Sequence, residues 1–459
     1  MDLMALVSKI RTPAKVLIFA HVPPPHHGQS YMVQLMLNGF GGDHRKVKPN
    51  RRMHFPFGVA CYHVNARVSQ SLEDIGYLRI GKFLLLIGYC LQAIWCHFRF
   101  GIDTFYYVPA PGKKSALFRD WLVMFFCRPF FKHVILHWHA AGLAKWLETV
   151  GQTRARSITF SLMKNADLSI VLSNYNRADA EKLFPKRTVV LGNGIPDPCP
   201  NFHDDVLPRR NARARVRTKL LAGQSPEQEE TNMAGPDPYT FKVLFLGHCT
   251  REKGLFDAID GVSLANAQLS ARKSPIQIHL TVAGSFMNPD ERAQYDARVR
   301  CADLQIRSSE SRPSGERMSG KPSVSYAGFV TGDSKQQLLS QSDCLCFPTY
   351  HYAESFGLVL VEAMAFGLTA VVSRWRSIPE LLPPDHTGFV DIRSPQQIAE
   401  ALIRLLACDS SEILRERFLE KFDLERYLSA LAATIAEIQS EKPSDLLLPG
   451  KAVGIVPRR

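Results

Sequence analysis

The chain has 459 residues, of which 46% are hydrophobic, and it carries a formal net charge of +13 with a sequence pI near 9.3. This length excludes a single ordinary core and predicts two domains of about 200 residues each. The excess of Lys and Arg predicts an anionic partner, for which nucleic acid, phospholipid and phosphorylated substrates are the candidates.

The ten cysteines are scattered singly and form no CxxC pair, which argues against a zinc cage and a thioredoxin-type site. Reduced thiols in a cytosol are the simplest account of them. Near the N-terminus, Lys9 and Arg11 interrupt the short apolar run, so the pattern does not predict a signal peptide. We therefore expect a cytoplasmic location.

Short β-branched or aromatic runs alternate with helical stretches in the first part of the chain. The runs lie at residues 16–20, 105–108, 134–136, 168–172 and 189–191. This alternation predicts one parallel, doubly wound sheet. We assign it to an N-terminal domain of residues 1–196.

The most apolar run, residues 83–96, is about 14 residues long and ends at His97 and Arg99. Because a bilayer span needs roughly 20 residues, the run predicts a buried helix and no transmembrane segment.

A second apolar stretch, residues 121–131, has basic residues on both sides. These residues are Lys113, Lys114, Arg119, Arg128 and Lys132. Such a segment could rest on an anionic membrane surface. A core-facing helix with solvated basic flanks explains the same pattern, and we favour it, with peripheral membrane contact as the open alternative.

A polar, Pro- and Arg-rich stretch at residues 197–240 breaks the alternation and predicts an interdomain linker. Its basic run, residues 209–219, has little periodicity and is expected to be solvated and mobile. A second alternating series predicts another parallel sheet, in a domain of residues 241–415. Its strands are expected at residues 243–246, 278–282, 325–327, 344–347 and 369–372.

Three segments lie outside this alternation. Residues 286–322 are polar and serine-rich and predict a poorly ordered surface loop. Residues 418–438 have helical apolar spacing, within a C-terminal segment of residues 416–439. Residues 440–459 predict a flexible tail.

Two acids, Glu354 and Glu362, are separated by seven residues. The pattern predicts a strand at 344–347, a loop that holds Glu354, and a helix from Leu358 to Phe366 that holds Glu362. Eight helical steps span roughly 12 Å, so the two carboxylates cannot share one proton and must have separate roles. An ordinary strand, loop and helix with a solvated Glu354 is the alternative.

Between the acids lies Ser355-Phe356-Gly357-Leu358. The glycine lets the backbone approach a ligand closely, and the free N–H groups that open the helix can bind an anion. A phosphate bound there would have one acid on each side. Each acid could accept hydrogen bonds from sugar hydroxyls.

This segment resembles the acid-x7-acid motif of the retaining glycosyltransferases of family 4, which have the GT-B architecture. Residues 241–247 and 251–254 resemble the strand and phosphate loop that open the second domain of that family. The remaining landmarks, in the expected order, are residues 23–30, 189–195, 279–284 and 324–330. The resemblance implies two Rossmann-like domains that face a central cleft, with residues 416–439 crossing back to the N-terminal domain.

The resemblance also implies catalytic roles for individual residues. Glu362 would bind the ribose hydroxyls of a nucleotide, and Glu354 would face the transferred sugar or the reaction centre. Lys253, with Arg251 close by, would stabilise the departing diphosphate. His139 would contact the donor sugar.

Two further residues belong to the implied nucleotide-sugar site, beside the phosphate seat at residues 355–358. Gly28 would let the backbone approach the sugar or the acceptor. His248 stands where many family members carry an arginine, and a histidine is a weaker phosphate partner near neutral pH. Either Arg251 substitutes for that arginine, or the chain is an impaired homologue that binds a nucleotide sugar without turning it over.

Competing site types lack their motifs. No Asp-x-Asp pair follows a strand, no GxxxxGK[ST] pattern is present, and Gly39-Phe40-Gly41 follows a helix-like stretch. We therefore expect no metal and no cofactor apart from the donor substrate. Most aromatic residues fall in apolar runs, which disfavours nucleic-acid binding as the use of the positive charge.

The combined expectation is a retaining, metal-independent hexosyltransferase. Its donor would be a UDP-sugar or GDP-sugar, and its acceptor a glycan or a lipid-linked glycan in cell-surface polysaccharide biosynthesis, by analogy with many family members. Retention in that family is explained by front-face attack, in which the departing phosphate oxygen takes the proton of the acceptor.

Overall fold

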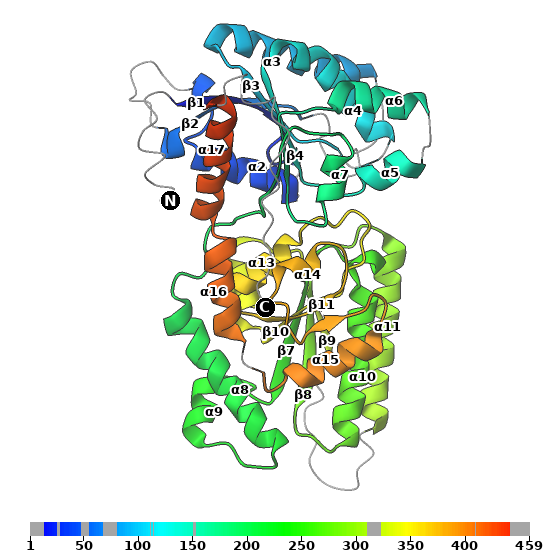
Figure 1. The fold of residues 1–459 in the computed structure, drawn as a ribbon. Helices are drawn as coiled ribbons and strands as arrows, with labels where there is room; N and C mark the ends of the chain where they lie inside the picture. The colour runs from blue at the N-terminus through cyan, green and yellow to red at the C-terminus, as the bar shows by residue number, and fades with distance from the viewer. Residues whose placement is uncertain are drawn as a thin grey trace, which may run out of the picture.

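The computed structural model describes residues 13–24, 28–46, 55–67, 80–110, 112, 114–149, 153–309, 323–408 and 410–440. Figure 1 shows two α/β lobes stacked one above the other, each built on a parallel six-stranded sheet. The predicted pair of doubly wound, parallel-sheet domains is therefore confirmed.

The first sheet has the strand order β2-β1-β3-β4-β5-β6, and each neighbouring pair is parallel. Its strands are β1 (Ala14–Ala20), β2 (Val59–Asn65), β3 (Thr104–Tyr107), β4 (His133–Trp138), β5 (Leu168–Val171) and β6 (Thr188–Val190). Its helices are α2 (Gly28–Gly39), α3 (Ile80–Phe100), α4 (Lys114–Cys127), α5 (Leu143–Thr149), α6 (Arg154–Met163) and α7 (Arg177–Glu181).

Strand β1 has helices on both of its faces. Val16 and Ile18 belong to a core cluster that includes residues of α2, whereas Leu17 and Phe19 belong to a second cluster with residues of α3 and α4. A strand buried on both faces is a nearly continuous apolar run, as β1 is.

The second sheet has the order β12-β11-β10-β7-β8-β9 and is also parallel throughout. Its strands are β7 (Thr240–Leu246), β8 (Gln277–Ala283), β9 (Val324–Gly328), β10 (Cys344–Phe347), β11 (Thr369–Ser373) and β12 (Phe389–Val390). The helices between them are α10 (Leu255–Ala271), α11 (Pro289–Ser309), α12 (Gly332–Gln341), α13 (Leu358–Ala365), α14 (Ile378–Leu381) and α15 (Pro395–Leu405).

The last two helices join the domains. Helix α16 (Ser411–Lys421) packs against α13 of the second domain, and α17 (Leu424–Ser440) lies on α2 and β1 of the first. Figure 1 shows this pair along one side of both lobes. At its end, Gln439 Nε2 donates a hydrogen bond of 2.8 Å to the carbonyl of Lys15.

The expectation of a solvated, mobile basic run at residues 209–219 is wrong. These residues form most of helix α8 (Leu207–Leu221), which is followed by α9 (Gln228–Ala234). Arg213 and Arg217 are buried and form ion pairs of 2.8 and 3.3 Å with Asp343 of the second domain. Burial raises the pKa of Asp343, but the two guanidinium groups outweigh it and the pKa lies below its ordinary value. The basic residues therefore hold α8 to the second domain.

Two more expectations need correction. The predicted loop at 286–322 contains helix α11 over residues 289–309, and residues 310–322 lie outside the described residues. The predicted 14-residue buried run is a helix of 21 residues, α3, with a largely exposed outer side. Within the described ranges, Gly81–Phe100 is the one helix whose length and composition would allow it to cross a membrane. The predicted features of residues 1–12 and 441–459 lie outside the described residues.

Candidate active site

The candidate site lies at the carboxyl ends of β7 and β10, which are neighbours in the second sheet. The loop after β7 contains a short 3-10 turn, η5 (Arg251–Lys253), and the loop after β10 contains Glu354. Gly254 brings the two loops together, because a Cβ atom there would lie 2.3 Å from the carbonyl oxygen of Pro348. Its φ of 79° is also one that favours glycine.

This contact places Lys253 against Glu354. The Nζ atom of Lys253 lies 2.5 Å from Oε2 of Glu354, and both side chains are largely buried. The hydroxyl of Thr349 lies 3.4 Å from the same carboxylate oxygen. The structure thus brings together Lys253, which was predicted to stabilise the departing diphosphate, and Glu354, which was predicted to face the transferred sugar or the reaction centre.

Two histidines lie beside this ion pair. Burial lowers the pKa of His248, Lys253 lowers it further, and Glu354 opposes the shift. Burial and Lys253 also lower the pKa of His351, whose Nε2 lies 3.7 Å from a carboxylate oxygen of Glu252. Both imidazoles are therefore neutral near pH 7. His351 was not among the predicted residues, although it opens the acid motif.

Arg251 is held by residues of α10 and α11. Its guanidinium donates to the side-chain oxygen of Gln294 at 2.5 Å and lies over the ring of Phe256, 4.9 Å from the centroid. Its backbone N–H donates to Glu291. The structure thus holds Arg251 on α10 and α11 and shows no contact between it and Glu354.

The predicted phosphate seat opens helix α13. Gly357 has a φ of 84°, and a Cβ atom there would lie 2.8 Å from Ile378 and 3.2 Å from Phe347. In the part of the chain that is described, the amide N–H groups of Phe356, Gly357 and Leu358 donate no hydrogen bond. They are the unpaired donors expected at a helix N-terminus, where the helix dipole also favours an anion.

Ser355 and Phe356 connect this seat to the first domain and to the core. The hydroxyl of Ser355 donates to the carbonyl of His139 at 2.6 Å, which places His139 at the domain boundary. The Ser355 carbonyl accepts from the side chain of Asn176 at 3.0 Å. The ring of Phe356 is buried against Phe422, so only its backbone is available to a ligand.

Gly28 also meets the second domain. A Cβ atom on Gly28 would lie 3.2 Å from a methyl group of Leu358, so the first residues of α2 and α13 face each other across the boundary. Both helices thus direct N-terminal ends, which favour anions, toward the same region.

Glu362 lies on α13, about one helical turn after the phosphate seat. Its Oε1 is 2.7 Å from Nζ of Lys335 on α12. Burial raises the pKa of Tyr31 on α2, and the charge of Glu362 raises it further, which places Glu362 close to the first domain. The sequence did not single out Lys335 or Tyr31, because neither belongs to the motif.

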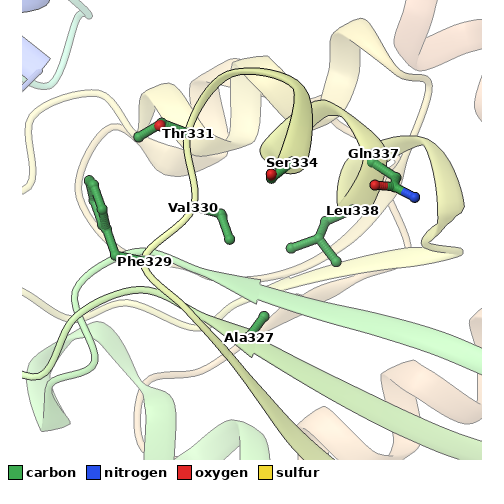
Figure 2. Close-up of a pocket in the computed structure, with 7 residues that line it drawn as sticks. All are labelled: Ala327, Phe329, Val330, Thr331, Ser334, Gln337 and Leu338. Carbon is green, nitrogen blue, oxygen red and sulfur yellow. The ribbon is translucent and has the colours of Figure 1, made fainter.

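A pocket of about 440 Å³ lies between the end of β9 and the first turns of α12 (Figure 2). It is lined by Ala327, Phe329, Val330, Thr331, Ser334, Gln337 and Leu338. Lys335, the partner of Glu362, comes from the same helix. The pocket and Glu362 are therefore neighbours at the carboxyl ends of the strands.

A further contact joins the domains at α14. The carboxylate of Glu380 accepts hydrogen bonds from the backbone N–H groups of Asn174 and Tyr175, at 2.8 and 2.7 Å. These amides follow β5 of the first domain. Glu380 is thus a carboxylate clamp across the boundary beside the site.

No group of three or more His, Cys, Asp or Glu side chains that could hold a metal ion occurs among the residues that the structure covers.

Residues 227–421 match the family described as Glycosyl transferases group 1. An uncharacterised glycosyltransferase of Methanocaldococcus jannaschii is 34% identical over 200 residues, which are 41% of this chain and 44% of that protein. The matched segments cover less than half the length of each curated relative.

Two solved structures are similar over nearly the whole chain. Sucrose-phosphate synthase from Thermosynechococcus elongatus has a TM-score of 0.57 at 20% identity, with 94% of this chain and all of that chain covered. The Anabaena protein HepE, in complex with UDP and glucose, has a TM-score of 0.56 at 15% identity, with 92% and 99% covered. The fold of this chain is therefore GT-B.

Proposed function

We propose that this chain transfers a hexosyl group from a nucleoside diphosphate sugar to a glycan or lipid-linked acceptor. The observation that carries the proposal is the Lys253–Glu354 ion pair beside the unpaired amides at the start of α13, where the two domains meet. The match of residues 227–421 to Glycosyl transferases group 1 and the GT-B fold support it. The HepE structure, with UDP and glucose, supports a nucleotide-sugar donor.

In this proposal the diphosphate lies between the ammonium of Lys253 and the amides of residues 356–358. As the glycosidic bond to the phosphate breaks, negative charge grows on the departing oxygen. A fixed cation and fixed N–H dipoles stabilise that charge because they are already oriented before the reaction. Glu354 holds Lys253 in place and faces the sugar.

The nucleoside extends away from this point. Glu362 accepts hydrogen bonds from the ribose hydroxyls, and Lys335 keeps its carboxylate oriented. The base occupies the pocket of Figure 2, where the highly exposed ring of Phe329 offers a stacking surface. This order of diphosphate, ribose and base fits the arrangement of the phosphate seat, Glu362 and the pocket along the carboxyl ends of the strands.

We further propose that transfer retains the anomeric configuration and needs no divalent cation. The departing phosphate oxygen takes the proton of the attacking acceptor hydroxyl on the same face of the sugar, so no separate protein base is required. Lys253 and the helix amides supply the positive charge for the leaving group. The resemblance to retaining family 4 enzymes supports this course, and it also supports a role in cell-surface polysaccharide synthesis.

A second candidate is a chain that binds a nucleotide sugar and turns it over poorly. The neutral His248 stands where related enzymes carry an arginine, and Arg251 is held on α11. Lys253 would then be the main cation for the diphosphate. This arrangement favours weak catalysis together with unimpaired binding of the nucleotide sugar.

A donor screen separates the two candidates. UDP, GDP and ADP are tested for thermal stabilisation of the full chain, since a ligand that binds only the folded state raises its stability according to its affinity. The matching nucleotide sugars are then tested for release of the nucleoside diphosphate with and without acceptor. Stabilisation with release supports a transferase, and stabilisation without release supports the second candidate. If no nucleoside diphosphate stabilises the chain, both are wrong.

A further inference from the structure

Helix α3 has apolar residues on two opposite faces. Its inner face buries Leu86, Cys90, Ala93 and Cys96 in the core of the first domain. Its outer face carries Leu84, Leu91, Trp95 and Phe98, each of which is more than half exposed. The spacing of seven, four and three residues between these outer positions places them in one stripe along the helix. An ordinary surface helix would have polar residues on that face.

The stripe continues onto the neighbouring segment. Phe98 packs edge-on against Phe130, with 6.0 Å between the ring centroids, and Phe125 of α4 is 62% exposed. Figure 1 shows α3 along the outer side of the first domain, with α4 beside it. Exposed apolar side chains that gather on adjacent elements in this way mark an interaction site. We call these six residues, Leu84, Leu91, Trp95, Phe98, Phe125 and Phe130, the outer face.

The sequence around the outer face is predominantly basic. Residues 80–133 contain seven Lys or Arg residues against two Asp residues. Of the two acids, Asp120 is fully buried and paired with Arg119, whereas the side chain of Asp103 is 63% exposed and lies 3.8 Å from a nitrogen of His97. An apolar surface within a basic region complements an anionic lipid surface, where basic residues meet headgroups and the apolar side chains enter the boundary with the acyl chains.

We propose that the outer face docks this protein on an anionic membrane, with α3 lying in the plane of the interface. The proposal does not depend on the proposed transferase activity. Docking in the plane follows from the inner face, because a helix that left the domain to span the bilayer would expose Leu86 and Cys90 and uncover the sheet. A second copy of the chain fits less well, because two such faces would bring like charges together.

The sequence favoured a core helix for residues 121–131 and made membrane contact the alternative. Two of the basic residues that flank this segment are not available to a membrane. Arg119 pairs with Asp120, and Arg128 donates to the carbonyl of Leu162. The side chains of Lys113 and Lys114 lie outside the described residues. The new observation is the stripe on α3.

Vesicle sedimentation tests the proposal with the full chain. Vesicles of phosphatidylcholine alone and vesicles with added phosphatidylglycerol serve as the two surfaces. We expect binding to the anionic vesicles, weaker binding to the neutral ones, and loss of binding in high salt. Leu91→Asp should lower the affinity at least about tenfold, since it removes one large apolar contact and adds a negative charge.

Ile413→Asp is the matched control. Ile413 is 57% exposed on α16 of the second domain and Leu91 is 58% exposed, so the two changes cost the fold a similar amount. Ile413→Asp should bind vesicles like the unchanged chain. Equal binding by the Leu91 variant, or no binding by the unchanged chain, overturns the proposal. So does concentration-dependent dimerisation that Leu91→Asp abolishes in the absence of vesicle binding.

Tryptophan fluorescence gives an independent readout. Trp95 is 53% exposed on the outer face. Anionic vesicles should shift the emission to shorter wavelength, and lipids brominated on the acyl chain should quench it. Trp95→Phe should remove both signals while vesicle sedimentation persists. Quenching that is unchanged in Trp95→Phe would place another part of the chain on the lipid and overturn the proposal.

Discussion

Lys253 and Glu354 are 101 residues apart in the chain, yet the ammonium of one lies 2.5 Å from a carboxylate oxygen of the other. They meet because β7 and β10 are adjacent parallel strands, so the loops at their carboxyl ends share one edge of the sheet. An ion pair at such an edge orients the ammonium before a ligand arrives.

The first prediction concerns this pair. Lys253→Ala should reduce kcat for donor turnover by about a hundredfold or more, because it removes the fixed cation beside the leaving diphosphate. Glu354→Gln should also reduce kcat, with a smaller effect on nucleoside diphosphate binding, because Glu354 is assigned to the sugar side. Initial rates and thermal stabilisation by the nucleotide measure the two effects. Lys421→Ala, at an exposed lysine on α16, is the control. Unchanged turnover in Lys253→Ala would contradict the proposed site.

The second prediction concerns Glu362. Glu362→Gln should raise the dissociation constant of the nucleoside diphosphate about tenfold, in line with the loss of charge-assisted hydrogen bonds, and leave kcat at saturation nearly unchanged. Titration calorimetry with the nucleotide and its 2′-deoxy form tests the ribose assignment directly. The unchanged chain should prefer the ribo form, and Glu362→Gln should lose most of that preference. An equal preference in both proteins would remove Glu362 from the ribose.

The two parallel, doubly wound sheets were predictable because they depend on local, repeated signals, whereas the GT-B assignment came from the resemblance of the motifs. Each β-branched run is short, each is followed by a helical or turn segment, and the alternation occurs twice. The placement of Lys253 beside Glu354 depends on the order of strands in the sheet, since the adjacent strands β7 and β10 bring their carboxyl ends together. The motif spacing identified Gly357 as the residue that opens α13.

Contacts between distant segments could not be predicted in this way. From the sequence alone, Arg213 is expected to be a solvated charge, because its neighbours do not indicate that Asp343, 130 residues later, pairs with it. Glu380 reads as an ordinary helix residue until the amides of Asn174 face it across the domain boundary. The outer face of α3 reads as core because apolar spacing does not reveal which face is covered.

The third prediction concerns the Glu380 clamp. Glu380→Ala removes the acceptor for two backbone N–H groups, those of Asn174 and Tyr175, and should loosen the domain boundary. We expect a larger radius of gyration by small-angle X-ray scattering and a higher KM for the donor, because binding must then close the domains. Glu412→Ala, at an exposed acid on α16, is the control. Identical scattering and KM would show that the clamp does not hold the domains.

The fourth prediction separates backbone strain from crowding at the phosphate seat. Gly357 and Gly223 both have positive φ, but a Cβ atom on Gly357 would lie 2.8 Å from Ile378, whereas nothing lies within 4 Å of one on Gly223. Gly223→Ala should cost about 1 kcal/mol of unfolding free energy, from the left-handed conformation alone. Gly357→Ala should cost more and should also abolish nucleotide stabilisation. Urea denaturation with and without nucleotide measures both, and equal costs with intact binding would contradict the seat.

The last prediction concerns pH. Burial, and to a smaller extent the neighbouring His139, lower the pKa of His137 well below its ordinary value, and its ring lies fully buried beside Tyr106. As the pH decreases, the unfolded chain therefore protonates His137 near pH 6.5, before the folded chain does. The unfolding free energy consequently falls as the pH decreases from about 6.5 toward the folded pKa of His137. The unfolding free energy should drop by up to about 1.4 kcal/mol per pH unit for this one proton.

In His137→Phe the drop between pH 7 and 5.5 should be smaller, even though the variant is less stable at pH 7 because the hydroxyl of Tyr106 loses its partner. His203→Gln, at an exposed histidine, is the control. Chemical denaturation across this pH range measures the slopes, and an unchanged slope in His137→Phe would mean that His137 does not link protonation to unfolding.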